Sequence, residues 1–159
     1  IILFVMFGVE LSKTTLVSDK ISKKLEFFLA NGFSIKTIIG KYLFSIYLVT
    51  FITILPSLIL NLLQLKISLV MILNFLLSSI LYTVIIVLMI LYTIKMDKIN
   101  SLQIKLIGLT IAIIIISILV YNFTDTIGLY LLSKVLILLP IILFLGINTD
   151  KERIVVSYY

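Results

Sequence analysis

The chain has 159 residues, of which 62% are hydrophobic, and its formal net charge is +6. Soluble domains contain roughly 45–50% apolar residues, so this composition excludes a soluble globular domain and indicates a protein that crosses a membrane several times. Cysteine and histidine are both absent, which excludes disulfides, thiolate or imidazole metal sites and every catalytic arrangement that requires histidine. The seven acidic residues are scattered, with no pair inside a predicted span, which argues against a carboxylate metal site.

Residues 1–9 are apolar but too few to cross a membrane by themselves. As a helix they would rise only about 13 Å, against a hydrocarbon core of about 30 Å. We therefore expect them to be the end of an earlier span, with further chain upstream of Ile1. A polar interval, residues 10–41, separates them from the long apolar runs.

Within this interval, residues 17–30 are predicted to form an amphipathic helix. Its apolar residues have the spacing of one helical face, and most of its charged residues lie off that face. Asn31-Gly32 is a helix-stopping signal, and Ser34 can cap a second helix that runs through Lys41 into the membrane. The apolar set is Val17, Ile21, Leu25, Phe28 and Leu29, and the charged set is Asp19, Lys20, Lys23 and Lys24.

Two interpretations of this amphipathic helix stay open from the residues alone. The helix could lie in the lipid headgroups, with its lysines reaching the phosphates. Alternatively, it could be a docking helix whose apolar face fits a groove on a soluble partner.

Four long apolar runs come after the polar interval, and each is predicted to be a transmembrane helix. They cover about residues 42–63, 69–94, 106–122 and 129–147. The expected fold is therefore an all-α, polytopic helical bundle, and residues 1–159 form a single transmembrane domain.

The distribution of lysine and arginine predicts the orientation of the spans. Of the 13 basic residues, only Lys66 and Lys134 lie on the side that would face outward. The positive-inside rule places residues 10–41, the loop 95–105 and the tail 148–159 in the cytoplasm. The basic charge is thereby explained, and no nucleic-acid partner is expected.

Several polar residues fall inside the predicted spans. Asn74, Ser78 and Tyr82 recur every four residues, so they share one helical face that should avoid lipid. That face could pack against other helices or line a substrate path. Lys134 could extend outward to the headgroups or pair with Asp125, and we favour the first because it needs no specific partner.

The polar interval resembles a loop of a known transporter family. The run Leu25-Glu26, Leu29-Ala30, Phe33-Ser34 and Gly40-Lys41 is similar to the cytoplasmic loop of type-two ABC exporter permeases. Those proteins carry an acid–base pair, then Gly-Thr-Leu-Glu, Leu-Leu, a small residue, Pro, an aliphatic residue, Ser and, later, Gly-Lys. Asp19-Lys20 would be the acid–base pair, whereas Lys23-Lys24 replaces Gly-Thr and Gly32 replaces the Pro.

The resemblance implies a permease subunit that dimerises, with an identical or paralogous second copy, and couples through residues 12–41 to a separate cytoplasmic ABC ATPase. The chain itself would be neither an enzyme nor a cofactor-binding protein, since the partner would use ATP and Mg²⁺. The implied substrate is a peptide or antimicrobial compound exported across a bacterial cytoplasmic membrane, with the C-terminus inside. The residues expected to couple to the ATPase are Ile21, Lys24, Leu25, Glu26, Phe28, Leu29 and Gly32, with Lys41 as the anchor where the next helix enters the membrane.

Gly40-Lys41 does not indicate a nucleotide site in this chain. A phosphate-binding loop needs Gly-x4-Gly-Lys-Ser/Thr after a strand, so that backbone amides surround the phosphates. Here seven residues separate Gly32 from Gly40, Tyr42 follows the lysine, and an apolar helix comes directly after.

Two other classes of function are weighed against the permease. The first is a non-transporting membrane scaffold or immunity protein that acts by helix packing and has no ATPase partner. The second is an intramembrane enzyme, which the absence of histidine, cysteine and paired acids argues against.

Overall fold

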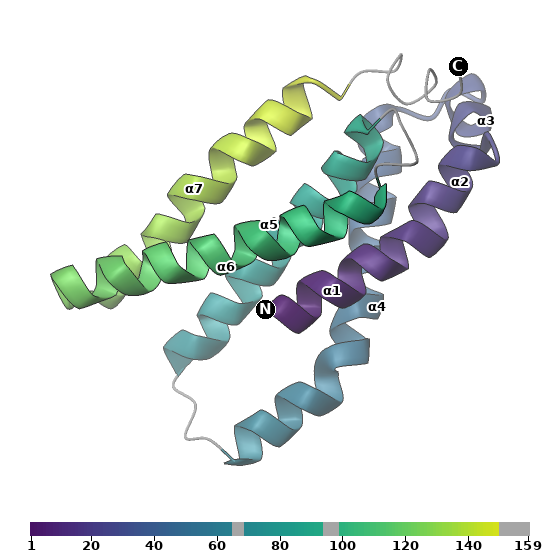
Figure 1. Cartoon of the computed structure of the whole chain (residues 1–159). Coiled ribbons are helices and arrows are strands. Elements are labelled where there is room, and N and C mark those ends of the chain that lie inside the picture. The colour runs from purple at the N-terminus through teal and green to yellow at the C-terminus, as the bar shows by residue number, and fades with distance from the viewer. Residues whose placement is uncertain (65–68, 94–98, 150–159) are drawn as a thin grey trace.

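The computed structural model describes residues 1–64, 69–93 and 99–149 (Figure 1). Every regular element in these ranges is a helix, and four of the helices are long and apolar enough to cross a membrane. These four are α4 (Ile35–Gln64), α5 (Leu69–Tyr92), α6 (Ile99–Thr124) and α7 (Ile127–Ile147). The predicted all-α bundle is confirmed, and the protein is a membrane protein.

α4, α6 and α7 begin before the apolar runs that predicted them, whereas α5 begins at Leu69 as predicted. α4 starts at Ile35, where the Ser34 hydroxyl accepts a 3.1 Å hydrogen bond from the backbone N–H of Thr37. This is the N-cap predicted for Ser34, and it satisfies a donor that the first helical turn leaves free. α6 starts at Ile99 and so begins before its apolar stretch.

The first helix is much longer than residues 1–9. α1 (Ile2–Ser12), the π-helical stretch η1 (Lys13–Val17) and α2 (Ser18–Ile21) succeed one another without a break, since the residues at both junctions are right-handed helical. The hydroxyl groups among these polar residues are satisfied within the helix, because they donate to backbone carbonyls one turn earlier. Ser12 Oγ donates to the Gly8 carbonyl at 2.7 Å, and Thr15 Oγ1 donates to the Leu11 carbonyl at 2.8 Å.

The amphipathic helix predicted over residues 17–30 is divided in two, which corrects that prediction. Ser22 ends α2, and Lys23 adopts a left-handed conformation with φ of 59°. A separate short helix, α3 (Lys24–Ala30), then leads to the turn at Gly32, where φ is 83°. No sequence signal marks the break, because lysine is not a residue that favours positive φ.

α5 is the central helix of the bundle. In an apolar 18-residue stretch of α5, 56% is buried. The corresponding stretches of α4, α6 and α7 are only 11–22% buried. α1 packs against α4, α5 and α6, while α7 packs against α5 and α6. The core joins residues from most of the helices, including Val5, Leu16, Leu25, Ile46, Ile85, Ile86, Leu91, Leu106 and Leu138.

Candidate functional site

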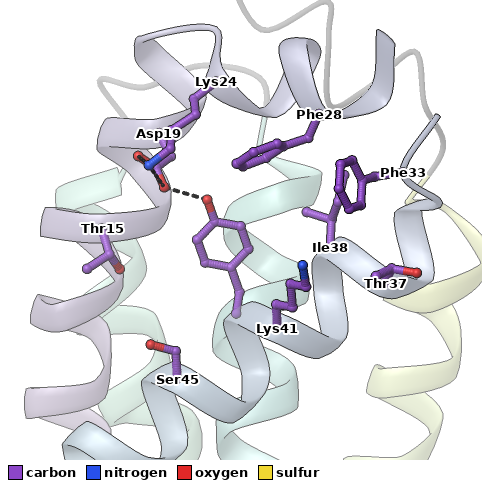
Figure 2. A pocket seen from close by; sticks show the side chains of 10 residues that line it. Thr15, Asp19, Lys24, Phe28, Phe33, Thr37, Ile38, Lys41 and Ser45 are labelled. Carbon is purple, nitrogen blue, oxygen red and sulfur yellow. Dashed lines mark hydrogen bonds and ion pairs between the residues drawn. The ribbon is translucent and has the colours of Figure 1, made fainter. Parts of the chain in front are cut away.

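The candidate site is a cavity of about 360 Å³ between the helix that ends in α2, the short helix α3 and the start of α4. Figure 2 shows aromatic, basic and hydroxyl side chains from all three segments converging on it. The site is built from residues of the segment that the sequence singled out. Its lining residues are Thr15, Asp19, Lys24, Phe28, Phe33, Thr37, Ile38, Lys41, Tyr42 and Ser45.

The Asp19 carboxylate links the three segments around the cavity. It accepts a 2.5 Å hydrogen bond from the Tyr42 hydroxyl of α4 and forms an ion pair at 3.2 Å with Lys24 of α3. Figure 2 shows the ends of the Asp19 and Lys24 side chains close together beside the cavity. A hydrogen bond to a charged acceptor contributes about 1.5–3 kcal/mol, whereas an exposed ion pair contributes at most about 1 kcal/mol. The Tyr42 contact is therefore the stronger link.

Lys20, next along the chain, is directed to a different helix. Its ammonium donates hydrogen bonds to the backbone carbonyls of Leu91 at 2.9 Å and Thr93 at 2.8 Å, and a longer one to Ile90 at 3.4 Å. These carbonyls stand at the C-terminus of α5, where helical partners run out and a cation is favourable. Lys20 thus caps α5.

The burial of Lys20 corrects the prediction that it lies off the apolar face. The side chain is only 2% exposed, and this burial lowers the pKa of its ammonium to about 8. The burial arises because the side chain extends from α2 to the end of α5, an acceptor that the periodicity of residues 17–30 does not contain.

The same segment also contacts α6. Lys13 donates a 3.2 Å hydrogen bond to the side-chain oxygen of Gln103 and pairs with Glu10 at 3.3 Å. The helix that ends in α2 is thus joined by polar contacts to α4, α5 and α6.

The residues expected to contact a partner divide into buried and exposed sets. Leu25 is 1% exposed and belongs to the core, so it offers no contact area while α3 keeps this position. Phe28 and Leu29 are half-buried against that core. Ile21 is 48% exposed. Lys24 and Gly32 are exposed, and Glu26 is half-buried.

Phe27 is the exposed aromatic residue that the sequence periodicity missed. It is 65% exposed on α3, and Phe33 is 42% exposed beyond the turn. We call the three exposed apolar residues Ile21, Phe27 and Phe33 the outer apolar face of the segment, and Phe33 also lines the cavity. The signal that could have found Phe27 is its pairing with Phe28, since adjacent helical residues cannot both face the core.

Lys41 lies inside α4, close to the loop. Its ammonium sits 5.0 Å from the centre of the Phe33 ring, a cation–π contact, and the side chain is otherwise exposed. Gly40 is likewise helical, so its backbone is committed to α4 and does not form a phosphate-binding loop.

A second polar cluster lies between the apolar helices. Lys134 of α7 is 5% exposed and donates hydrogen bonds to the Asn74 side-chain oxygen at 2.7 Å and to the Tyr130 hydroxyl at 2.9 Å. The expectation that Lys134 extends outward is therefore wrong, because α5 supplies an acceptor inside the bundle. Ser78 and Tyr82 are each 2% exposed, which confirms that this stripe faces protein.

Comparison with known proteins assigns neither cluster. No family model matches the chain, and no match was found among curated proteins or solved structures.

Proposed function

We propose that this chain is the membrane-spanning permease subunit of an ABC exporter, in which a separate ATPase drives the export of a substrate. The observation that carries the proposal is the pair Asp19-Lys20. One residue holds α4 and the next holds α5, so the segment that resembles the exporter loop is fastened to two apolar helices at once. A scaffold that acts by packing alone gives no reason for such a segment to present an outer apolar face.

The contacts suggest how force would pass into the membrane. A partner that pushes on α3 would move Lys24, and with it the Asp19 carboxylate and the Tyr42 hydroxyl of α4. The same displacement of α2 would pull Lys20 against the end of α5. Because α5 is the central helix, its movement would displace the helices that pack against it.

The backbone at Lys23 gives independent support to the resemblance. The related permeases carry Gly where this chain has Lys23, and φ of 59° is a conformation that Gly adopts without a Cβ penalty. The turn at Gly32 differs from that of the family. Gly32 has φ of 83°, which Pro cannot adopt, so this turn takes another path than one built on the family's Pro.

The outer apolar face is the proposed ATPase contact. Ile21, Phe27 and Phe33 present apolar area, and Lys24 and Glu26 supply charges beside it. Exposed aromatic residues are frequent anchors of protein interfaces. In this proposal the face lies in the cytoplasm of a bacterial cell, the C-terminus lies on the same side, and two permease copies enclose the path.

Replacing Phe27 with Asp tests the contact. The full-length protein, purified gently from its native cell, should bring with it a stoichiometric ATPase that contains a P-loop, and Phe27→Asp should reduce that amount at least tenfold. The matched control is Phe123→Asp, since Phe123 is 86% exposed but lies near the end of α6, far along the chain from the segment. Reproducible absence of any ATPase from the wild-type preparation would favour the scaffold function instead.

A further inference from the structure

Lys134 is a buried cation inside a helix that is long and apolar enough to cross a membrane. It comes seven residues after the start of α7 at Ile127, which is about 10 Å along the helix. Its side chain is 5% exposed. Ionisable groups inside membrane-spanning segments are rare, and they mark substrate paths, ion paths and ligand counter-ions.

The partners of Lys134 carry no negative charge. They are the Asn74 amide oxygen and Tyr130, whose hydroxyl accepts a hydrogen bond and whose ring centre lies 4.1 Å from the ammonium. In the ranges that the structure describes, the ion pairs join Lys13 to Glu10 and Lys24 to Asp19, and no carboxylate pairs with Lys134. An ammonium has three donors, so the two hydrogen bonds leave one donor for a further acceptor.

A cavity lies beside the two residues that hold this ammonium, and Lys134 itself stands behind them, outside the cavity wall. The cavity measures about 260 Å³, and Asn74 and Tyr130, which hold Lys134, form part of its wall. Tyr121 and Ile127 contribute aromatic and aliphatic surface. At about 30 Å³ per water-sized group, the space accommodates a carboxylate and the single residue or chain end that bears it.

We propose that this cavity binds the carboxylate of an apolar molecule, with the Lys134 ammonium, directly behind Asn74 and Tyr130 in the cavity wall, as its counter-ion. One cation matches a singly charged group, which favours a carboxylate over a phosphate that carries more charge. The Asn74 amide nitrogen uses one N–H on the Tyr130 hydroxyl, which itself accepts from Lys134, so the second amide N–H and the Tyr130 O–H are further donors at the same place. The C-terminus of an apolar peptide and the head of a fatty acid share this chemistry.

The carboxylate site is independent of the proposed ATPase contact. It needs only the membrane-spanning part of this chain, and its binding is measured without a partner. If the chain is an exporter, the site names the chemical group that its substrate carries. Loss of ATPase association would leave carboxylate binding unchanged, and absence of carboxylate binding would leave the outer apolar face untouched.

The test is calorimetric titration of the full chain in nanodiscs of phosphatidylcholine, with protein-free nanodiscs subtracted. The first probe pair is N-acetyl-trileucine and its C-terminal amide, and the second is dodecanoate and dodecanamide. At least one acid should bind at least ten times more tightly than its amide. Preference confined to the tripeptide identifies a peptide source, preference confined to dodecanoate identifies a lipid source, and preference in both pairs supports the shared carboxylate.

Variants locate the binding. Lys134→Met should abolish the difference between acid and amide, whereas Lys41→Met, at the other polar cluster, should leave it intact. Asn74→Asp keeps Lys134 but places a carboxylate 2.7 Å from it, so it should also abolish binding of the acids. Equal affinity of acid and amide for the wild-type protein, or no binding of any probe, overturns the proposal even if every variant fails to fold.

Discussion

The Tyr42 hydroxyl donates a 2.5 Å hydrogen bond to the Asp19 carboxylate, across the cavity between the first helix and α4. Because this acceptor is charged and the contact is partly shielded, Tyr42→Phe should lower the free energy of unfolding by about 1.5–3 kcal/mol. A double-mutant cycle with Asp19→Asn, measured by denaturant titration in detergent micelles, checks the value. Additive effects of the two changes would show that the residues do not interact.

Lys23 is a position where the native residue carries a backbone cost. A non-glycine residue in the left-handed region costs about 1–2 kcal/mol, and part of this cost is removed when Cβ is absent. Lys23→Gly should therefore raise the free energy of unfolding by up to about 1 kcal/mol.

The matched control for Lys23→Gly is Lys105→Gly. Lys105 is also exposed, but it lies within α6, where Gly lowers stability by about 1 kcal/mol. Opposite signs for the two Lys→Gly changes are expected in the same denaturant titration. A loss of stability in both variants would mean that Lys23 does not hold the positive φ in the native protein.

Lys20 should make stability depend on pH. Burial lowers the pKa of its ammonium to about 8 from the 10.5 of an exposed lysine, so between these values the unfolded chain holds more protons than the folded one. Stability contributed by this group is therefore lowest below pH 8 and rises as the pH increases from about 8 to 10.5. The expected rise is about 1–3 kcal/mol.

Lys20→Met removes this rise and leaves the carbonyls at the end of α5 without their cap. The free energy of unfolding is measured at several pH values for Lys20→Met and for Lys36→Met. The slope of this free energy against pH is then compared between the two variants. Lys36 is exposed, so its removal controls for the general effect of losing one lysine. Equal slopes in the two variants would contradict the assignment of the pH dependence to Lys20.

Truncation to Ala should destabilise the protein more at Leu25 than at Phe27, although Phe is the larger residue. Leu25 is 1% exposed and part of the core, so Leu25→Ala should cost about 2–4 kcal/mol of stability. Phe27 is 65% exposed, and Phe27→Ala should change stability by less than about 0.5 kcal/mol. Thermal unfolding of the two variants separates the core residue from the surface residue.

Hydropathy predicted the apolar helices because lipid imposes one requirement, that backbone polar groups be satisfied within each segment. Equally local rules predicted the Ser34 cap and the buried face of Ser78 and Tyr82. The site is harder to predict, since its contacts join distant residues. The acceptor of Lys134 comes from α5, and the carbonyls capped by Lys20 also lie at the end of that helix.

Further differences lie within residues 17–30. The left-handed Lys23 reorients the residues after it relative to those of α2, and no glycine or proline marks this position. The periodicity of residues 17–30 placed Leu25 on the apolar side, and in the structure that residue belongs to the protein core. Lys20, which the periodicity placed off that side, is buried against the end of α5.

Substitutions of Asn74 test the charge of Lys134 while leaving the lysine in place. In Asn74→Leu the ammonium loses its 2.7 Å acceptor, and a buried cation with one fewer partner should cost about 2–4 kcal/mol. Asn74→Asp supplies a counter-ion of nearly the same shape, so this variant should be at least as stable as the wild-type protein. The comparison is made by denaturant titration in detergent micelles at pH 7. If Asn74→Asp and Asn74→Leu were destabilised equally, the amide of Asn74 would matter for packing and not as the acceptor of a charged lysine.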